Sequence, residues 1–271
     1  MDIGTMISEL GVQRYMLAMT LGLPRLSVLI LMAPFMGGSI VTGQLKFSLI
    51  FALYLVIFPL IIHQAPPEAG TGVTDFIGYV AIAVKESFLG FILAYISGIP
   101  FLTAQSAGFL MDNQRGASMA SGSDPLSGEE TSPLGSFFFQ SLVYMFFSSG
   151  AFLIYLGVIF QSYSFWPITA WWPDLLSNEA AFFFMWLVVW LMSKMLLLAG
   201  PVVASSLLTD ISLGIINRFA SQLNVYVLAM PIKSALAMLI VLMYYSVFIS
   251  LSPGMFNFIN QSLETLRTYW P

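Results

Sequence analysis

The chain has 271 residues, of which 58% are hydrophobic and only 8% are charged, and its mean hydropathy is +0.88. A soluble domain carries about 25% charged residues. The excess apolar mass must therefore face lipid or other protein, which predicts an integral membrane protein. The nine basic residues are scattered and form no cluster, so the sequence argues against nucleic-acid binding.

Most groups on which enzymes and metalloproteins depend are missing. There is no cysteine, and the single histidine, His63, has no second histidine with which to share a metal or to complete a catalytic dyad. No phosphate-binding G-x-x-x-x-G-K-[ST] and no G-x-S-x-G nucleophile motif occurs. We expect no enzyme activity, no cofactor and no metal.

Six apolar runs alternate with short polar segments along the chain. They cover residues 15–36, 47–62, 76–111, 134–161, 180–216 and 225–251. A membrane-spanning helix needs about 20 residues, so the runs allow about six to eight crossings, some of them incomplete. The fold class predicted is an all-α, multi-pass membrane protein.

Prolines interrupt most of these runs. They include Pro24, Pro34, Pro100, Pro201 and Pro231. Proline removes a backbone donor and clashes with the preceding turn, and the freed carbonyls are tolerated at membrane depth only inside protein or beside water. Together they predict broken helices and helical hairpins packed within an assembly.

Two charges lie in the middle of the third run. Lys85 and Glu86 together cost about 5–7 kcal/mol on the insertion scale, whereas the apolar residues around them return about 5 kcal/mol. Adjacent residues point about 100° apart on a helix, so we expect that they cannot satisfy each other and that each has a partner elsewhere. Gly90, Ala94 and Gly98 follow at four-residue spacing and form a small-residue face on which another helix can pack.

A polar stripe follows Pro201. With helical spacing it comprises Ser206, Asp210, Gly214, Asn217, Ser221 and Asn224, and Arg218 and Lys233 lie nearby. Asp210 and Arg218 are two turns apart, too far for a direct bond. Ionisable groups at membrane depth mark either a transport pathway or a paired contact. No carboxylates converge here as in an ion site, so the stripe favours contacts between helices or subunits.

Two segments carry a family resemblance. Residues 209–234, TDISLGIINRFASQLNVYVLAMPIKS, resemble the signature of the T subunit of the type III secretion export apparatus, a family related to the flagellar R export protein. Residues 109–135, FLMDNQRGASMASGSDPLSGEETSPLG, resemble the central loop of the virulence (injectisome) branch, chiefly through DNQRG and TSPLG.

This resemblance implies a structural and gating subunit of a protein-conducting export gate. Family members assemble as a single copy with R- and S-type subunits in the bacterial inner membrane, within the basal body of the secretion system. The U-type subunit, the inner rod or needle proteins and, transiently, unfolded substrates are the further partners that the resemblance implies. The implied fold is a set of helical hairpins largely withdrawn from lipid.

The resemblance also divides the chain. Hairpins at about 1–111 and 134–271 flank a polar loop at 112–133, which corresponds to the family's plug in the closed channel. The candidate plug residues are Asp112, Asn113, Gln114, Arg115, Gly116, Met119, Gly122 and Gly128. Glycine and serine suit a movable obstruction, and methionine adapts to an irregular constriction. Asp112 and Arg115 are spaced to pair at the end of the apolar helix. The alternative for this loop is a solvated connector.

A secondary transporter is the alternative function, because transporters also use broken helices and buried charges. Transporters usually contain a repeated pair of broken segments related by internal symmetry, and the sequence contains no such repeat. An intramembrane enzyme would need the catalytic groups that are missing.

Overall fold

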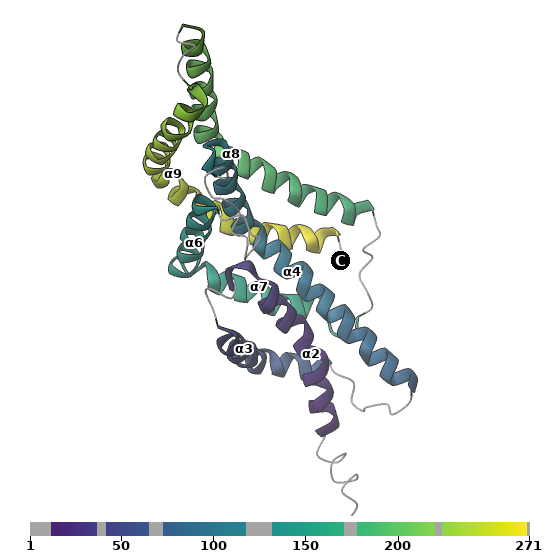
Figure 1. Cartoon of the computed structure of the whole chain (residues 1–271). Coiled ribbons are helices and arrows are strands. Elements are labelled where there is room, and N and C mark those ends of the chain that lie inside the picture. Colours follow the sequence, from purple (N-terminus) through teal and green to yellow (C-terminus); the bar gives the residue numbers. More distant parts are fainter. Residues whose placement is uncertain are drawn as a thin grey trace, which may run out of the picture. The chain divides into compact units, whose positions relative to one another are not determined.

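The structure is a computed structural model, in which every regular element of the described residues is a helix (Figure 1). The described residues are 12–36, 42–64, 73–117, 132–170, 178–219 and 224–269. The elements are α2 (Val12–Met32), the 3₁₀ helix η1 (Pro34–Met36), α3 (Gly43–Gln64), α4 (Val73–Gln114), α6 (Pro133–Ser148), α7 (Ala151–Phe165), α8 (Asn178–Phe219) and α9 (Val225–Tyr269).

Five of these helices are long and apolar enough to cross a membrane, and the interrupted pair α6–α7 makes a sixth candidate if it counts as one span. Five lies below the expected range of six to eight and six lies at its lower end, because the longest helices extend well beyond a bilayer thickness. Both α4 and α8 have 42 residues, and α9 continues to Tyr269 rather than ending with its apolar run at residue 251. The predicted class, an all-α multi-pass membrane protein, is confirmed.

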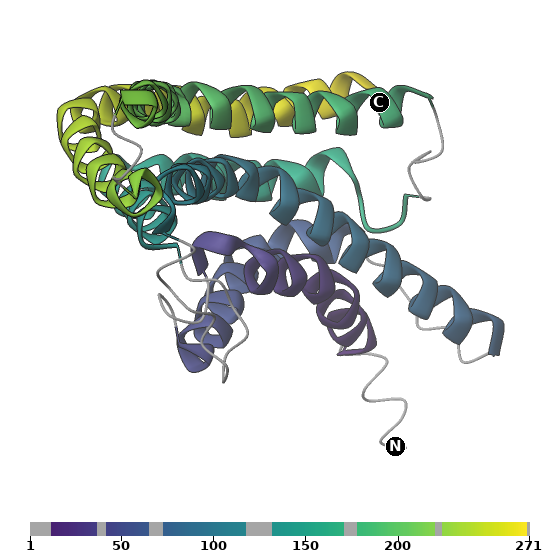
Figure 2. The same cartoon turned by 45° about the horizontal axis from the view of Figure 1, so that its top comes forward.

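The chain divides into two compact units. The first comprises residues 1–98, 152–183 and 259–271, and the second comprises residues 99–151 and 184–258. In the first unit α2 packs against α3 (Figure 2). The Tyr54 hydroxyl donates a hydrogen bond to the carbonyl of Ala18 at 2.8 Å, and the side chains of Tyr54 and Ile61 approach Gly22 closely.

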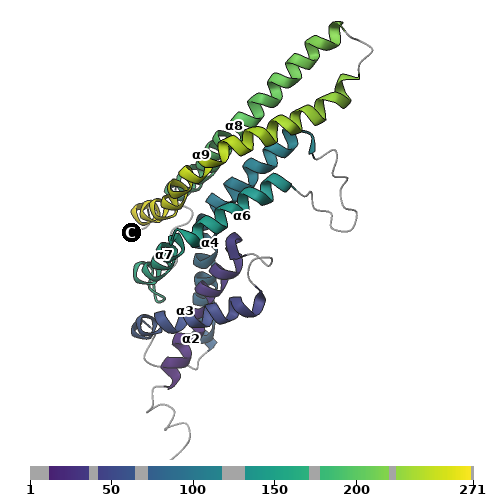
Figure 3. The same cartoon turned by 90° about the vertical axis from the view of Figure 1, so that its left-hand side faces the viewer.

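The second unit is held largely by aromatic side chains. Phe101 of α4 meets Phe146 of α6 edge to face at 5.3 Å between ring centroids, and Phe138 meets Phe248 of α9 at 5.0 Å. Helices α8 and α9 lie side by side as a hairpin (Figure 3). The rings of Trp190 and Phe258 stack across this hairpin at 3.8 Å. Edge-to-face and stacked pairs add to the burial of apolar area.

The helix breaks are not where the prolines predicted them. Helices α2, α4, α8 and α9 continue through Pro24, Pro100, Pro201 and Pro231, because a membrane helix tolerates proline where neighbouring groups satisfy the freed carbonyls. Only Pro34 coincides with a break, where it begins η1. The other break separates α6 from α7 at Ser149–Gly150, where glycine takes φ +77°.

Candidate functional site

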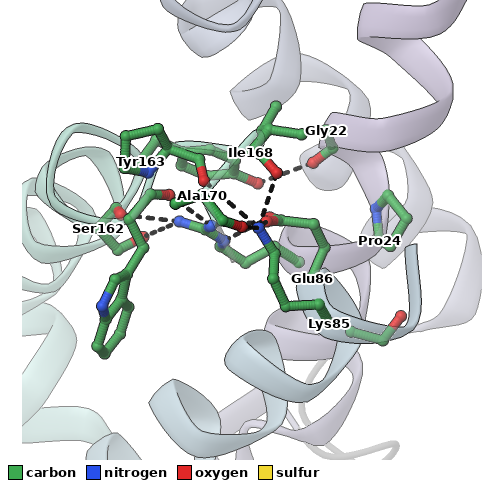
Figure 4. A network of polar contacts seen from close by, with 12 residues as sticks. Gly22, Pro24, Lys85, Glu86, Ser162, Tyr163, Ile168 and Ala170 are labelled. Atoms are coloured by element: carbon green, nitrogen blue, oxygen red, sulfur yellow. Dashed lines mark hydrogen bonds and ion pairs between the residues drawn. The ribbon is translucent and has the colours of Figure 1, made fainter. Parts of the chain in front are cut away.

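A buried ion cluster forms the polar centre of the first unit (Figure 4). Arg25 of α2 donates two parallel hydrogen bonds to Glu86 of α4, from Nε to Oε2 at 2.7 Å and from Nη2 to Oε1 at 2.9 Å. Both side chains are completely buried. This fork is the geometry in which a guanidinium binds a carboxylate most strongly.

The remaining donors of Arg25 go to the end of α7. Nη1 donates to the carbonyl of Ser162 at 2.8 Å and approaches its hydroxyl at 3.4 Å, and Nη2 donates to the carbonyl of Trp166 at 2.8 Å. All five guanidinium N–H groups therefore have acceptors. The guanidinium also lies 4.3 Å from the ring centroid of Tyr163, whose hydroxyl donates to the carbonyl of Gly22 at 2.8 Å.

Lys85 completes the cluster from the same turn of α4. Its Nζ donates to the carbonyls of Ile168 at 2.7 Å and Ala170 at 2.9 Å, and it lies 3.0 Å from Glu86 Oε1. The expectation that Lys85 and Glu86 cannot satisfy each other was wrong. Their flexible side chains turn toward the same point although their Cα–Cβ bonds diverge.

The acceptors in this cluster are mainly backbone carbonyls at the end of α7 and in the turn that follows it. Carbonyls at a helix end need donors from outside the helix, although that of Ser162 also accepts from the Trp166 amide. α7 ends at Phe165, and Arg25 and Lys85 bind carbonyls at its last turn and in the turn that follows it. Positive charge is also favoured at a helix C-terminus. The cluster thus closes one helix end with two cations and fastens α2, α4 and α7 together.

The helices that carry these charges touch through glycine. A Cβ added to Gly90 would lie 2.3 Å from the carbonyl oxygen of Arg25, and one added to Gly98 would lie 2.8 Å from the Pro34 ring. Ala94 between them is buried. The predicted small-residue face is confirmed as the surface of α4 that packs on α2 and η1.

Sequence reasoning missed Arg25 as the partner of Glu86. A lone arginine within an apolar run was the available signal, since an intramembrane charge needs a counter-charge and only a few acidic residues lie in the other runs. The hydrogen-bonding groups of Arg25, Lys85 and Glu86 are engaged with one another and with backbone. The arrangement therefore stabilises structure and leaves no donor aimed at a substrate.

A second polar cluster lies at the base of the predicted plug loop. Arg115 Nε and Nη2 each lie 2.7 Å from Asp112 Oδ1, which confirms the predicted pair. The other oxygen, Oδ2, accepts from the Ser132 hydroxyl at 2.6 Å and from the Leu134 amide at 2.9 Å. This carboxylate therefore connects α4 to α6.

The loop begins later than expected. α4 continues through Gln114, so Asp112, Asn113 and Gln114 form its last turn, because the bonds of Asp112 hold that turn in place. Gly116 follows with φ +78°, a conformation that favours glycine. Met119, Gly122 and Gly128 lie outside the described residues.

The polar stripe of α8 is divided by burial. Ser206 is buried, whereas Gly214, Asn217 and Arg218 are exposed. Asp210 is 46% exposed and forms an ion pair with Lys233 of α9. Ser221 lies outside the described residues, and Asn224 is exposed where α9 begins.

The part of α8 that packs within the chain includes the first residue of the stripe. From residue 198 onward, its buried residues are Leu198, Ala199, Val202, Ser206, Thr209 and Leu213. From Asp210 onward the stripe therefore faces outward. Only 17% of the spanning part of α8 is buried within the chain.

Comparison with known proteins decides the family. The model of "Bacterial export proteins, family 1" matches residues 16–259, which include the ion cluster, the loop base and the α8 stripe. The chain belongs to this family.

Relatives of this bacterial export protein come from secretion systems and flagella. Yop proteins translocation protein T of Yersinia pestis is 37% identical over 88% of this chain and 89% of its own length. The surface presentation of antigens protein SpaR of Salmonella typhimurium is 28% identical over 83% of this chain and 82% of its own. The flagellar biosynthetic protein FliR of Bacillus subtilis is 29% identical over 70% and 72%.

These relatives confirm the predicted resemblance to the T subunit of the type III secretion export apparatus. The bacterial export protein thus has a role in export machinery, as a multi-pass membrane protein. The names of its relatives refer to protein translocation, surface presentation of antigens and flagellar biosynthesis, and none of these names is that of an enzyme.

Proposed function

We propose that the chain is a structural and gating subunit of the protein-conducting channel of the export apparatus, in the bacterial inner membrane. The observation that carries this proposal is the outward-facing polar stripe of α8. Asp210, Asn217 and Arg218 lie there among exposed leucine and isoleucine side chains. Such a surface suits neither lipid nor water.

The energies favour a protein partner. A charged side chain facing the centre of a bilayer costs about 2.5–3.5 kcal/mol, and the pairing of Asp210 with Lys233 offsets only part of this cost. Small and polar residues on a membrane helix allow close approach and hydrogen bonding between helices. In this proposal R-, S- and U-type subunits cover the stripe, and one copy of the chain enters each complex.

The segment between Arg115 and Ser132 is the proposed obstruction of the closed channel. Its two flanks are held together by Asp112. A seal for ions must later admit an unfolded chain, so it has to be movable. The inner rod or needle proteins and the substrates would meet the channel beyond this seal.

Assembly is tested by expression with and without partners. The tagged chain is produced alone and together with R- and S-type subunits, and its yield, half-life and size distribution are compared. We expect rapid degradation of the chain alone and rescue by the partners. Equal yield and a single homogeneous species without partners would contradict the proposal and favour the secondary transporter.

Gating is tested by shortening the loop within residues 116–128. We expect normal assembly, because the described contacts at the loop base remain, together with increased uptake of small ions or dyes at matched complex abundance. Unchanged permeability with normal assembly would mean that the loop is a connector and that partner subunits make the seal.

A further inference from the structure

Asp112 divides its carboxylate between two helices. Among the described residues, Oδ1 accepts from Arg115 in its own helix end, and Oδ2 accepts from Ser132 and Leu134 at the start of α6. The Ser132 hydroxyl also accepts from the Gly135 amide at 2.9 Å and so caps α6. One buried side chain therefore joins two points that are 20 residues apart in the sequence.

A close backbone contact lies one turn earlier. A Cβ added to Gly108 would lie 2.4 Å from the Gly135 amide nitrogen and 2.5 Å from the Leu134 carbonyl oxygen. The backbones of α4 and α6 thus touch at this level, and Asp112 binds the same end of α6 four residues later. Two contacts one helical turn apart fix both the separation and the register of the helices.

The same junction is tied to α9. Arg115 Nη1 approaches the Ser234 hydroxyl at 3.4 Å, and the Met230 side chain lies 3.5 Å from where a Cβ of Gly116 would be. Lys233, which pairs with Asp210, is in the same turn of α9. The end of α4 is therefore anchored to the hairpin that carries the polar stripe.

We propose that Asp112 is a positioning residue that fixes the two points where the chain leaves α4 and enters α6. We call the bonds of Asp112 to Arg115, Ser132 and Leu134 the Asp112 clasp. A connector that only had to link the helices would not need this clasp, because the entropy of closing a loop changes slowly with its length. A segment that must stay in register with a channel does need fixed ends. The inference rests on the proposed function, since it makes the Asp112 clasp the foundation of the seal.

Asp112→Asn is the sharpest single test. Asparagine has nearly the same shape but only one acceptor oxygen, so it must lose either Arg115 or the start of α6. In cells carrying the full apparatus we expect unchanged complex abundance, a several-fold rise in ion leak per complex and a loss of most secretion per complex. Ser136→Ala, at an exposed position in the first turn of α6, is the matched control and should behave as wild type.

A covalent rescue separates positioning from ordinary stability. The natural chain has no cysteine, so Asp112→Cys with Ser132→Cys introduces the only two thiols. Before treatment this double variant should leak as Asp112→Asn does. Bridging the two thiols with a short bifunctional reagent should restore low leak and secretion.

Two results would overturn the proposal. One is a fall in complex abundance that accounts for the whole loss of secretion in Asp112→Asn. The other is complete cross-linking without recovery. If loop shortening causes no leak while cross-linking still restores secretion, the proposed seal is wrong and the clasp stands. If loop shortening causes a leak and Asp112→Asn does not, the clasp is wrong and the seal stands.

Discussion

The ion cluster of the first unit and the polar stripe of α8 both place charged side chains in an apolar protein, but they differ in where those charges find partners. Arg25, Glu86 and Lys85 are buried and find all of their partners within the chain. Among the described residues Asp210 pairs with Lys233 and remains half exposed, and Arg218 is exposed on the same helix. Charged side chains therefore have two roles in this protein. Those of the ion cluster stabilise the chain itself, and those of the stripe remain available for contacts outside it.

This difference separates two classes of variant. Changes in the cluster should damage the chain itself, because buried groups would be left without partners. Changes in the stripe should leave the chain inserted and should damage its association with other subunits.

Glu86→Gln should have the largest effect. It leaves the two cations of Arg25 and Lys85 buried without a counter-charge, and breaking a buried pair costs about 3–5 kcal/mol. The membrane-inserted chain should disappear rapidly in a pulse-chase experiment, even when partner subunits are present. Glu264→Gln, at an exposed position of α9, is the control. A normal half-life for Glu86→Gln would show that the cluster does not hold the unit together.

Arg25→Lys should have a smaller effect, because the charge is kept. Lysine has three N–H donors where arginine has five, so it leaves some acceptors among Glu86 and the carbonyls of Ser162 and Trp166 unbonded. Each unsatisfied buried group costs about 1–3 kcal/mol. We expect the Arg25→Lys chain to persist in the membrane, and its purified complex to have a lower thermal midpoint than that of wild type. An unchanged thermal midpoint would mean that a positive charge at this position is enough to stabilise the cluster, whatever its number of donors.

Gly90→Ala tests the close approach that makes the cluster possible. The new Cβ would collide with the backbone of Arg25, and overpacking of this kind costs about 1–3 kcal/mol. Gly200→Ala is the matched control, since nothing lies within 4 Å of its Cβ position. Alanine in a helix is favoured over glycine by about 1 kcal/mol, so this control should be neutral or slightly stabilising. Equal thermal midpoints for the two variant complexes would contradict the close contact between Gly90 and the backbone of Arg25.

Asp210→Leu should disturb the chain least. Its carboxylate is half exposed, so the loss to the chain itself is about 1 kcal/mol or less. Partner donors left without an acceptor should reduce recovery of the complex and secretion, while the amount of inserted chain stays the same. Ser212→Leu adds the same side chain to another exposed face of α8 and should assemble normally. If the complex with the Asp210 variant were recovered at the wild-type level, the stripe would not be part of the subunit interface.

Local patterns in the sequence predicted much of this structure. The apolar runs located the helices, the small residues after Glu86 marked a packing face, and Asp112 with Arg115 predicted a pair. Each of these signals comes from residues close together in the chain, where helix geometry alone decides what meets.

The partners of the buried charges were not predictable in the same way. Arg25 lies 61 residues from Glu86, and most of the other acceptors are backbone carbonyls, which leave no trace in residue identity. The pair of Asp210 with Lys233 depends on how the α8–α9 hairpin closes. The helix break at Gly150 was missed because prolines, which the long helices accommodate, are the stronger local signal.

The ion cluster also imposes an order on biogenesis. Arg25 is synthesised before Glu86, and the carbonyls of residues 162–170 follow about 80 residues after that. At about 5–20 residues per second, roughly 4–16 seconds pass between the emergence of the charged pair and that of its last acceptors. During this interval α2 and α4 hold cations whose final partners do not yet exist. Until residues 162–170 have been made these acceptors are missing, so the speed of translation sets how long the cluster stays incomplete.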